Sequence, residues 1–151
     1  MLALVGFVGL CLLVGAADGS VVAGAPRGWY QSLNRPPGTP PDWVFMTVWT
    51  GLYATIGLAA WLVWRRAVGT RPLRLWGWQL AATACWTPAF FALHSPPLAL
   101  AVCLVLLALI VLTMRAFLPV RRAAAWLMAP YLAWTVYATY LTAGFWWLNP
   151  T

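Results

Sequence analysis

Five long apolar runs dominate this sequence, and short basic or proline-rich segments separate them. A transmembrane helix needs roughly 20 predominantly apolar residues to cross the hydrocarbon core of a bilayer. The runs reach that length without the polar–apolar alternation of β-barrel strands. We therefore expect an all-α membrane protein, a bundle of five transmembrane helices in a single domain over residues 1–151. The expected spans are residues 2–22, 39–64, 75–93, 98–117 and 123–148.

The composition excludes a soluble domain. Hydrophobic residues make up 64% of the chain and charged residues only 7%. So few polar side chains could not cover the surface of a soluble fold. The net charge of +7 is carried by arginines between the apolar runs, which we interpret as topology signals and contacts to lipid headgroups. We expect membrane lipid as a partner and no nucleic acid.

The arginines predict an orientation. In a five-span bundle, the N-terminus and the segments after the second and fourth spans share one side. That side holds Arg65, Arg66, Arg71, Arg74, Arg115, Arg121 and Arg122. The proline-rich loop over residues 25–41, with Arg27 and Arg35, lies on the other. The positive-inside rule then places the N-terminus in the cytoplasm. Helical spans favour the bacterial inner membrane.

Two features of the first run have alternative interpretations. Residues 23–25 resemble a signal-peptide cleavage site, but no basic residue precedes the run, so we favour a retained helix. Asp18 lies near the far end of the run. An ionisable residue at depth in a membrane is a candidate functional group, whereas at the interface it is a solvated end residue. We favour the solvated interpretation.

Catalytic and metal-binding patterns do not emerge from the sequence. The chain has one histidine, two acidic residues and three scattered cysteines. These cannot assemble a Ser-His-Asp triad, paired carboxylates or a metal-ligand spacing. We expect no catalytic residue, no metal and no resident cofactor, and the sequence favours a binding protein over an enzyme.

Aromatic stripes run along three of the expected helices. The chain has 12 tryptophans, and an aromatic belt at the membrane surface explains those that flank spans. It does not explain Trp49, Trp86 and Trp134, which lie well within spans. Side chains at helical spacing share one face. The stripes are Phe45, Trp49, Tyr53 and Gly57; Gln79, Thr83, Trp86 and Phe90; and Tyr131, Trp134, Ala138, Thr142 and Phe145.

These stripes have a plain interpretation and a functional one. Ordinary helix packing accounts for any single stripe. Three stripes that combine aromatic walls with a few hydrogen-bonding groups, such as Gln79 and Thr83, are typical of a pocket for a flat apolar ligand.

Several segments resemble the TspO/MBR family of tryptophan-rich sensory proteins and translocator proteins. They are the strings at residues 29–36, 40–45 and 49–53, the residues Gln79-Leu80, Trp86 and Phe90-Phe91, and the string at residues 130–134. The resemblance covers nearly the whole chain. It implies a five-helix bundle, often a homodimer, whose pocket lies among the helices beneath the first loop.

The resemblance also implies ligands and site residues. Family members bind porphyrins such as protoporphyrin IX, haem-like tetrapyrroles, sterols in eukaryotes and benzodiazepine-type drugs. By position, the family's pocket residues correspond to Tyr30, Pro40, Trp49, Tyr53, Trp86, Phe90, Trp134 and Ala138. We add Thr83, which stands where the family usually has Asn, as Thr142 does on the last helix. A hydroxyl is smaller than an amide and offers different hydrogen bonds, so ligand preference is expected to differ.

Three functions fit such a pocket. The first is binding or sensing of a tetrapyrrole, whose carboxylates would meet Arg27 or Arg35. The second is light-dependent porphyrin breakdown through the pocket tryptophans. The third is assisted transport, although the spans carry no clear coupling residue for an active pump. A purely structural membrane protein is the remaining alternative.

Overall fold

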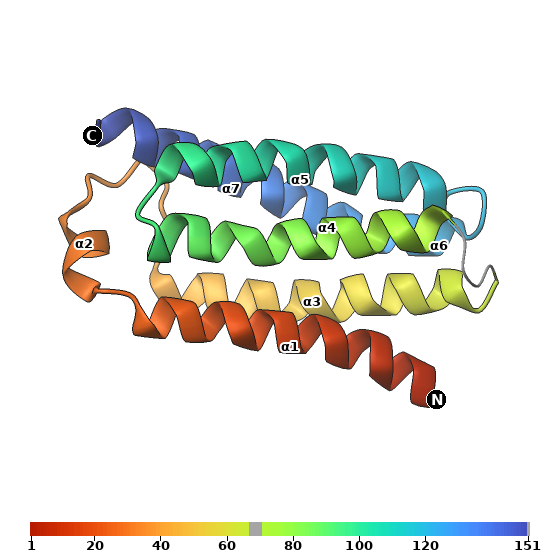
Figure 1. Ribbon diagram of the computed structural model, residues 1–151. Helices are drawn as coiled ribbons and strands as arrows, with labels where there is room; N and C mark the ends of the chain where they lie inside the picture. Colours follow the sequence, from red (N-terminus) through yellow and green to blue (C-terminus); the bar gives the residue numbers. More distant parts are fainter. Residues whose placement is uncertain (67–70, 151) are drawn as a thin grey trace.

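The computed structural model describes residues 1–66 and 71–150, apart from the Arg27 side chain, and within these ranges the ordered elements are helical. Figure 1 shows elongated helices packed side by side, with α2 and the C-terminus at one end and the N-terminus at the other. The elements are α1 (Leu2–Gly24), α2 (Arg27–Ser32), α3 (Asp42–Trp64), α4 (Arg71–Thr87), η1 (Pro88–Ala92), α5 (Pro96–Phe117), α6 (Arg122–Leu127) and α7 (Ala129–Leu148).

The prediction of an all-α chain is confirmed for the described residues. Three of their helices have the length and apolar character of a membrane span: α1, α3 and α5, with mean hydropathies of 2.1, 1.4 and 2.8. The predicted third span falls on α4 and η1, and the predicted fifth on α6 and α7. The loop predicted over residues 25–41 differs from the expectation in one respect, because it contains the short helix α2.

Prolines mark where helices begin or change. Pro41 precedes α3, and α5 opens with Pro96 at its first position, where a missing N–H costs nothing. Pro88 sits where α4 turns into the π-helix η1, since its ring removes one donor from the helical ladder. The Leu93 N–H closes this wider turn on the Pro88 carbonyl at 2.9 Å. The π-helix carries Phe90 and Phe91, whose rings contact Tyr30 of α2.

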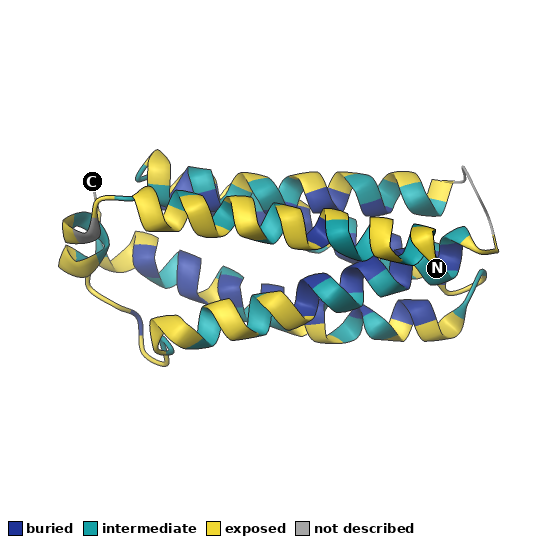
Figure 2. Ribbon diagram, turned by 90° about the horizontal axis from the view of Figure 1, so that it is seen from below, coloured by how far each residue is buried: buried dark blue, intermediate teal, exposed yellow. Residues whose placement is uncertain are grey.

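The helices form two layers. In one layer α1 packs along α3, and in the other α5 packs against both α4 and α7. Close backbone contact between the layers occurs where α3 meets α6 and where α1 meets α4 and η1, and it is sparse between α3 and α7. Figure 2 shows buried residues on the faces that the helices turn toward one another. The space between α3 and α7 is therefore spanned mainly by side chains.

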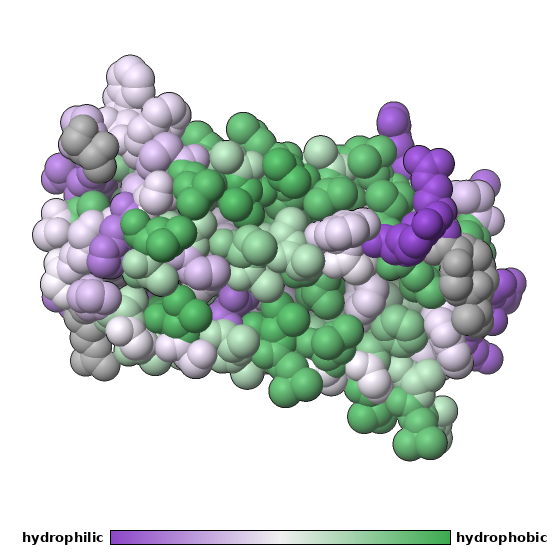
Figure 3. Space-filling view, viewed as in Figure 1, coloured by the Kyte–Doolittle hydropathy of each residue, from purple (hydrophilic) through white to green (hydrophobic). Residues whose placement is uncertain are grey.

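The outer surface suits a bilayer. Figure 3 shows hydrophobic side chains over the middle of one face and hydrophilic ones near its two ends. Leu104, Val105 and Val136 are more than half exposed, at 56%, 57% and 54%. An apolar surface of this kind is stable against lipid tails and unfavourable in water.

A glycine sets the spacing of α1 and α3. A Cβ atom added at Gly57 would lie 2.7 Å from the Val8 Cα and 2.8 Å from the Phe7 carbonyl oxygen. Both are backbone atoms, so α1 could accept a side chain there only by moving away from α3.

We predict that Gly57→Ala lowers the free energy of unfolding by about 1–3 kcal/mol, the usual cost of overpacking. Equilibrium denaturation in mild detergent would measure it. Gly51→Ala is the matched control, because that position of α3 has open space around it and Ala favours a helix by up to about 1 kcal/mol. Equal effects of the two substitutions would contradict the close contact.

Candidate functional site

One group of aromatic rings lies near α2; we name it the loop-end cluster. It consists of Tyr30, Trp86, Phe90, Phe91 and Phe145. The Trp86 and Phe90 rings stack at 5.4 Å with an interplanar angle of 16°. Phe145 meets the edge of Phe90 at 5.4 Å, and Tyr30 lies 5.9 Å from Phe145. The short helix α2 thus places Tyr30 over rings from η1 and α7.

A second group, the central cluster, spans the gap between the layers. It consists of Phe45, Trp49 and Tyr53 of α3 with Tyr131 and Trp134 of α7. Trp49 lies 5.5 Å from Tyr53 and 6.1 Å from Tyr131, and Phe45 meets Trp134 at 5.6 Å. These offset and edge-to-face arrangements are the ones aromatic pairs prefer. The stripes on the second and fifth predicted spans therefore face each other.

A hydroxyl pair connects the two clusters. The Thr83 Oγ1 and Tyr131 hydroxyl oxygens lie 2.5 Å apart, and Thr83 also donates to the Gln79 carbonyl at 2.8 Å. A hydroxyl has one proton, so Tyr131 donates to Thr83. Trp86 of the loop-end cluster follows Thr83 on α4 by about one helical turn. We call the two clusters together the candidate site.

Asp18 is half-buried and makes a hydrogen bond to α3, a contact that our solvated interpretation did not include. The Tyr53 hydroxyl donates to the Asp18 Oδ2 at 2.7 Å. Gly15, one turn earlier on α1, makes room for the Tyr53 ring, since a Cβ there would lie 2.6 Å from the ring. The sequence signal was an ionisable residue in an apolar run, which we interpreted as a solvated end residue because it lies near the far end of that run.

Several buried polar atoms in the candidate site and one turn away from it on α4 are left without a partner. Among the described residues, the indole Nε1 atoms of Trp86 and Trp134 and both amide atoms of Gln79 make no hydrogen bond. Buried polar groups in native proteins are nearly always paired with protein or with water. These atoms therefore mark the interior as a place for a polar molecule or ligand group.

Two charged residues, Arg35 and Asp42, lie beside Tyr30 of the loop-end cluster, and we call this place the mouth of the cluster. The Arg35 guanidinium lies 4.9 Å from the centre of the Tyr30 ring and 3.8 Å from an Asp42 carboxylate oxygen. Burial raises the pKa of the Tyr30 phenol above its usual value; Arg35 partly opposes this shift and Asp42 adds to it. The Arg27 side chain, the other predicted carboxylate contact, lies outside the described residues.

Two amides fasten the loop after α2 to the end of α7. The Asn34 backbone N–H donates to the Asn149 Oδ1 at 2.8 Å, and the Asn149 Nδ2 donates to the Asn34 carbonyl at 3.1 Å. The Asn149 Nδ2 also donates to the Phe145 carbonyl at 2.9 Å, so the clamp includes a residue of the loop-end cluster. We call this pair the asparagine clamp.

Further contacts continue along α7. The Tyr137 hydroxyl donates to the Gly38 carbonyl at 2.5 Å, and the Tyr140 hydroxyl donates to the Pro37 carbonyl at 3.1 Å. Pro36 is buried against Gly144, where a Cβ would lie 2.6 Å from the proline Cβ. The loop thus has a defined position along α7.

The structure brings together seven of the nine predicted site residues, Tyr30, Trp49, Tyr53, Thr83, Trp86, Phe90 and Trp134. Pro40 lies half-buried in the loop before α3, and Ala138 is 9% exposed on α7, one turn after Trp134. Three ring neighbours were in our stripes but not among the predicted site residues: Phe45, Tyr131 and Phe145. Phe91 and Asp18 are additional neighbours.

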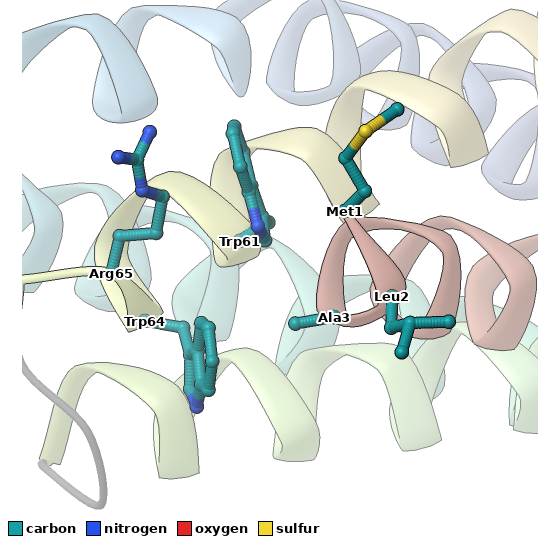
Figure 4. Close-up of a pocket in the computed structure, with 6 residues that line it drawn as sticks. All are labelled: Met1, Leu2, Ala3, Trp61, Trp64 and Arg65. Atoms are coloured by element: carbon teal, nitrogen blue, oxygen red, sulfur yellow. The ribbon is translucent and has the colours of Figure 1, made fainter.

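Two open surface hollows lie elsewhere. One, of about 840 Å³, is lined by the start of α1 and the end of α3: Met1, Leu2, Ala3, Trp61, Trp64 and Arg65 (Figure 4). The other, of about 440 Å³, lies along the outside of α7 beside Pro36 and Pro37. Neither is lined by a predicted site residue. We assign the site to the buried clusters because unpartnered polar atoms mark them.

We predict that Thr83→Val lowers the free energy of unfolding by about 1–3 kcal/mol, because it leaves the buried Tyr131 hydroxyl without its acceptor. Denaturation in detergent would measure it. The control is Thr113→Val, at a buried threonine whose hydroxyl donates to the Leu109 carbonyl of its own helix. A loss no larger than that of the control would contradict the Thr83–Tyr131 link.

Comparison with known proteins identifies the family of this chain. The model of the TspO/MBR family matches residues 7–148. The tryptophan-rich protein TspO of Chlorobaculum tepidum is 38% identical over 148 residues, which cover 95% of this chain and 93% of that protein. The translocator protein of Bos taurus is 33% identical over 94% of this chain and 87% of its own length. A tryptophan-rich sensory protein of Cereibacter sphaeroides is 40% identical over 76% of this chain and 72% of its own length. The chain belongs to the TspO/MBR family.

Proposed function

We propose that this protein binds flat, apolar ligands of the tetrapyrrole type, such as protoporphyrin IX, in the candidate site. The observation that carries the proposal is a set of aromatic rings from α3, α4, η1 and α7 that meet inside an apolar bundle together with unpartnered buried N–H groups. Aromatic faces stack on a planar macrocycle, and a few polar groups fix its orientation.

The loop end of the site supplies a complementary charge. A tetrapyrrole with carboxylate side chains would direct them toward Arg35, which lies over Tyr30 at the mouth. Arginine is suited to this role, because its planar guanidinium pairs with a carboxylate through two hydrogen bonds. Binding of this kind is the step that sensing, transfer and breakdown of a tetrapyrrole have in common.

The membrane setting of the proposal is a five-span bundle. Besides α1, α3 and α5, the continuous pair α4–η1 and the pair α6–α7 run the length of the molecule beside them (Figure 1). Arginines follow α3, begin α4, end α5 and precede α6, at the same end as the start of α1. The positive-inside rule supports a cytoplasmic position for that end. The asparagine clamp would then face the opposite side.

The double substitution Trp49→Leu with Trp134→Leu tests the binding proposal. We expect it to weaken protoporphyrin IX binding roughly tenfold or more, because each aromatic contact contributes about 0.5–1.5 kcal/mol beyond its buried area. Titration of the porphyrin's Soret absorbance against the purified protein would measure the change without relying on tryptophan fluorescence.

The control is Trp126→Leu with Trp147→Leu, which removes two tryptophans that are 69% and 85% exposed. Thermal unfolding without ligand shows whether each variant is folded. If a folded central-cluster variant binds as tightly as the control, the proposed site is wrong.

A further inference from the structure

Gln79 is buried completely, at 0% exposure, yet both its amide nitrogen and its amide oxygen lack a hydrogen-bond partner among the described residues. It lies on α4, one turn from Thr83 and on the same face of the helix. A buried amide without partners is unfavourable, and hydrocarbon around the bundle offers none. The Gln79 amide therefore needs a hydrogen-bonding partner that the described residues around it do not supply.

The neighbouring hydroxyls do not serve this amide. Thr83 gives its proton to the main-chain carbonyl of Gln79 and accepts the proton of Tyr131, so the two hydroxyls are engaged with each other. Trp76, one turn earlier on α4, adds another buried indole N–H without a partner among the described residues. The unpaired hydrogen-bonding groups in this region are therefore the adjacent N–H and C=O of the Gln79 amide and the indole N–H of Trp76.

We propose that Gln79 determines ligand specificity by pairing with a planar amide- or lactam-type group of a ligand in the candidate site. This inference rests on the proposed function. A lactam offers one N–H beside one C=O, which is the complement of the Gln79 amide. A neutral group suits the position, because the arginines of α4 are exposed residues of its first turns and a carboxylate at Gln79 would carry an uncompensated charge.

Two flat probes of the same three-ring outline test the pairing. Phenanthridinone carries a lactam in its central ring, and phenanthrene is the hydrocarbon without it. Quenching of tryptophan fluorescence gives the affinity of each probe for wild type and for Gln79→Leu in the same detergent. Comparing variants cancels the different partition of the probes into micelles.

We expect Gln79→Leu to reduce the preference for phenanthridinone over phenanthrene roughly tenfold, with phenanthrene binding unchanged. The matched control is Gln31→Leu, at the chain's other glutamine, which is exposed on α2. Its preference should equal that of wild type. Gln79→Met repeats the test with a flexible isostere in case the leucine variant fails to fold.

An unchanged preference in a folded Gln79 variant overturns the inference, including the case in which a buried water satisfies the amide and no ligand reaches it. The proposed function has a separate readout. Wild type that binds neither probe contradicts the aromatic site itself, whereas binding of both probes with no effect of Gln79 contradicts only the pairing.

Discussion

The rings that separate α3 from α7 are the feature on which the rest of this structure depends. Helices with small residues between them approach closely, as α1 does to α3 at Gly57. α3 and α7 are not in such close contact, and the rings of Trp49, Tyr131 and Trp134 fill the space between them. The bundle consequently has an interior made of aromatic surface. In the proposed function, a planar ligand would make with these rings the same kind of contact that the rings make with one another.

The polar groups of the interior follow from the absence of water in the hydrocarbon core. Each polar side chain must find its partner within the protein or in what the protein binds. Tyr53 with Asp18, and Tyr131 with Thr83, are pairs of the first kind. Gln79 and the indoles of Trp86 and Trp134 lack a partner among the described residues, so they suit pairing with a bound molecule. The asparagine clamp closes the loop above them through groups that lie outside the expected spans.

Local sequence signals predicted much of this arrangement. Apolar runs of sufficient length gave the helices, and the spacing in each run gave the inward stripes, because both are properties of neighbouring residues. Contacts between distant segments could not be read in this way. The clamp joins Asn34 and Asn149, which are 115 positions apart. The Asp18–Tyr53 hydrogen bond depends on how α1 packs against α3. The π-helical turn at η1 depends on how the helix accommodates Pro88. To predict the Thr83–Tyr131 hydrogen bond, one would have to know how the stripes on α4 and α7 are aligned with each other along the helices.

A structure of the protein with protoporphyrin IX bound in a lipid environment would show whether the ligand lies among the rings of α3 and α7. We expect the macrocycle in contact with Trp49 and Trp134, beneath the loop held by the asparagine clamp and with its carboxylates toward Arg35. A tetrapyrrole bound only on the lipid-facing surface, or in the open hollow at the start of α1, with the central cluster packed as it is here, would contradict it.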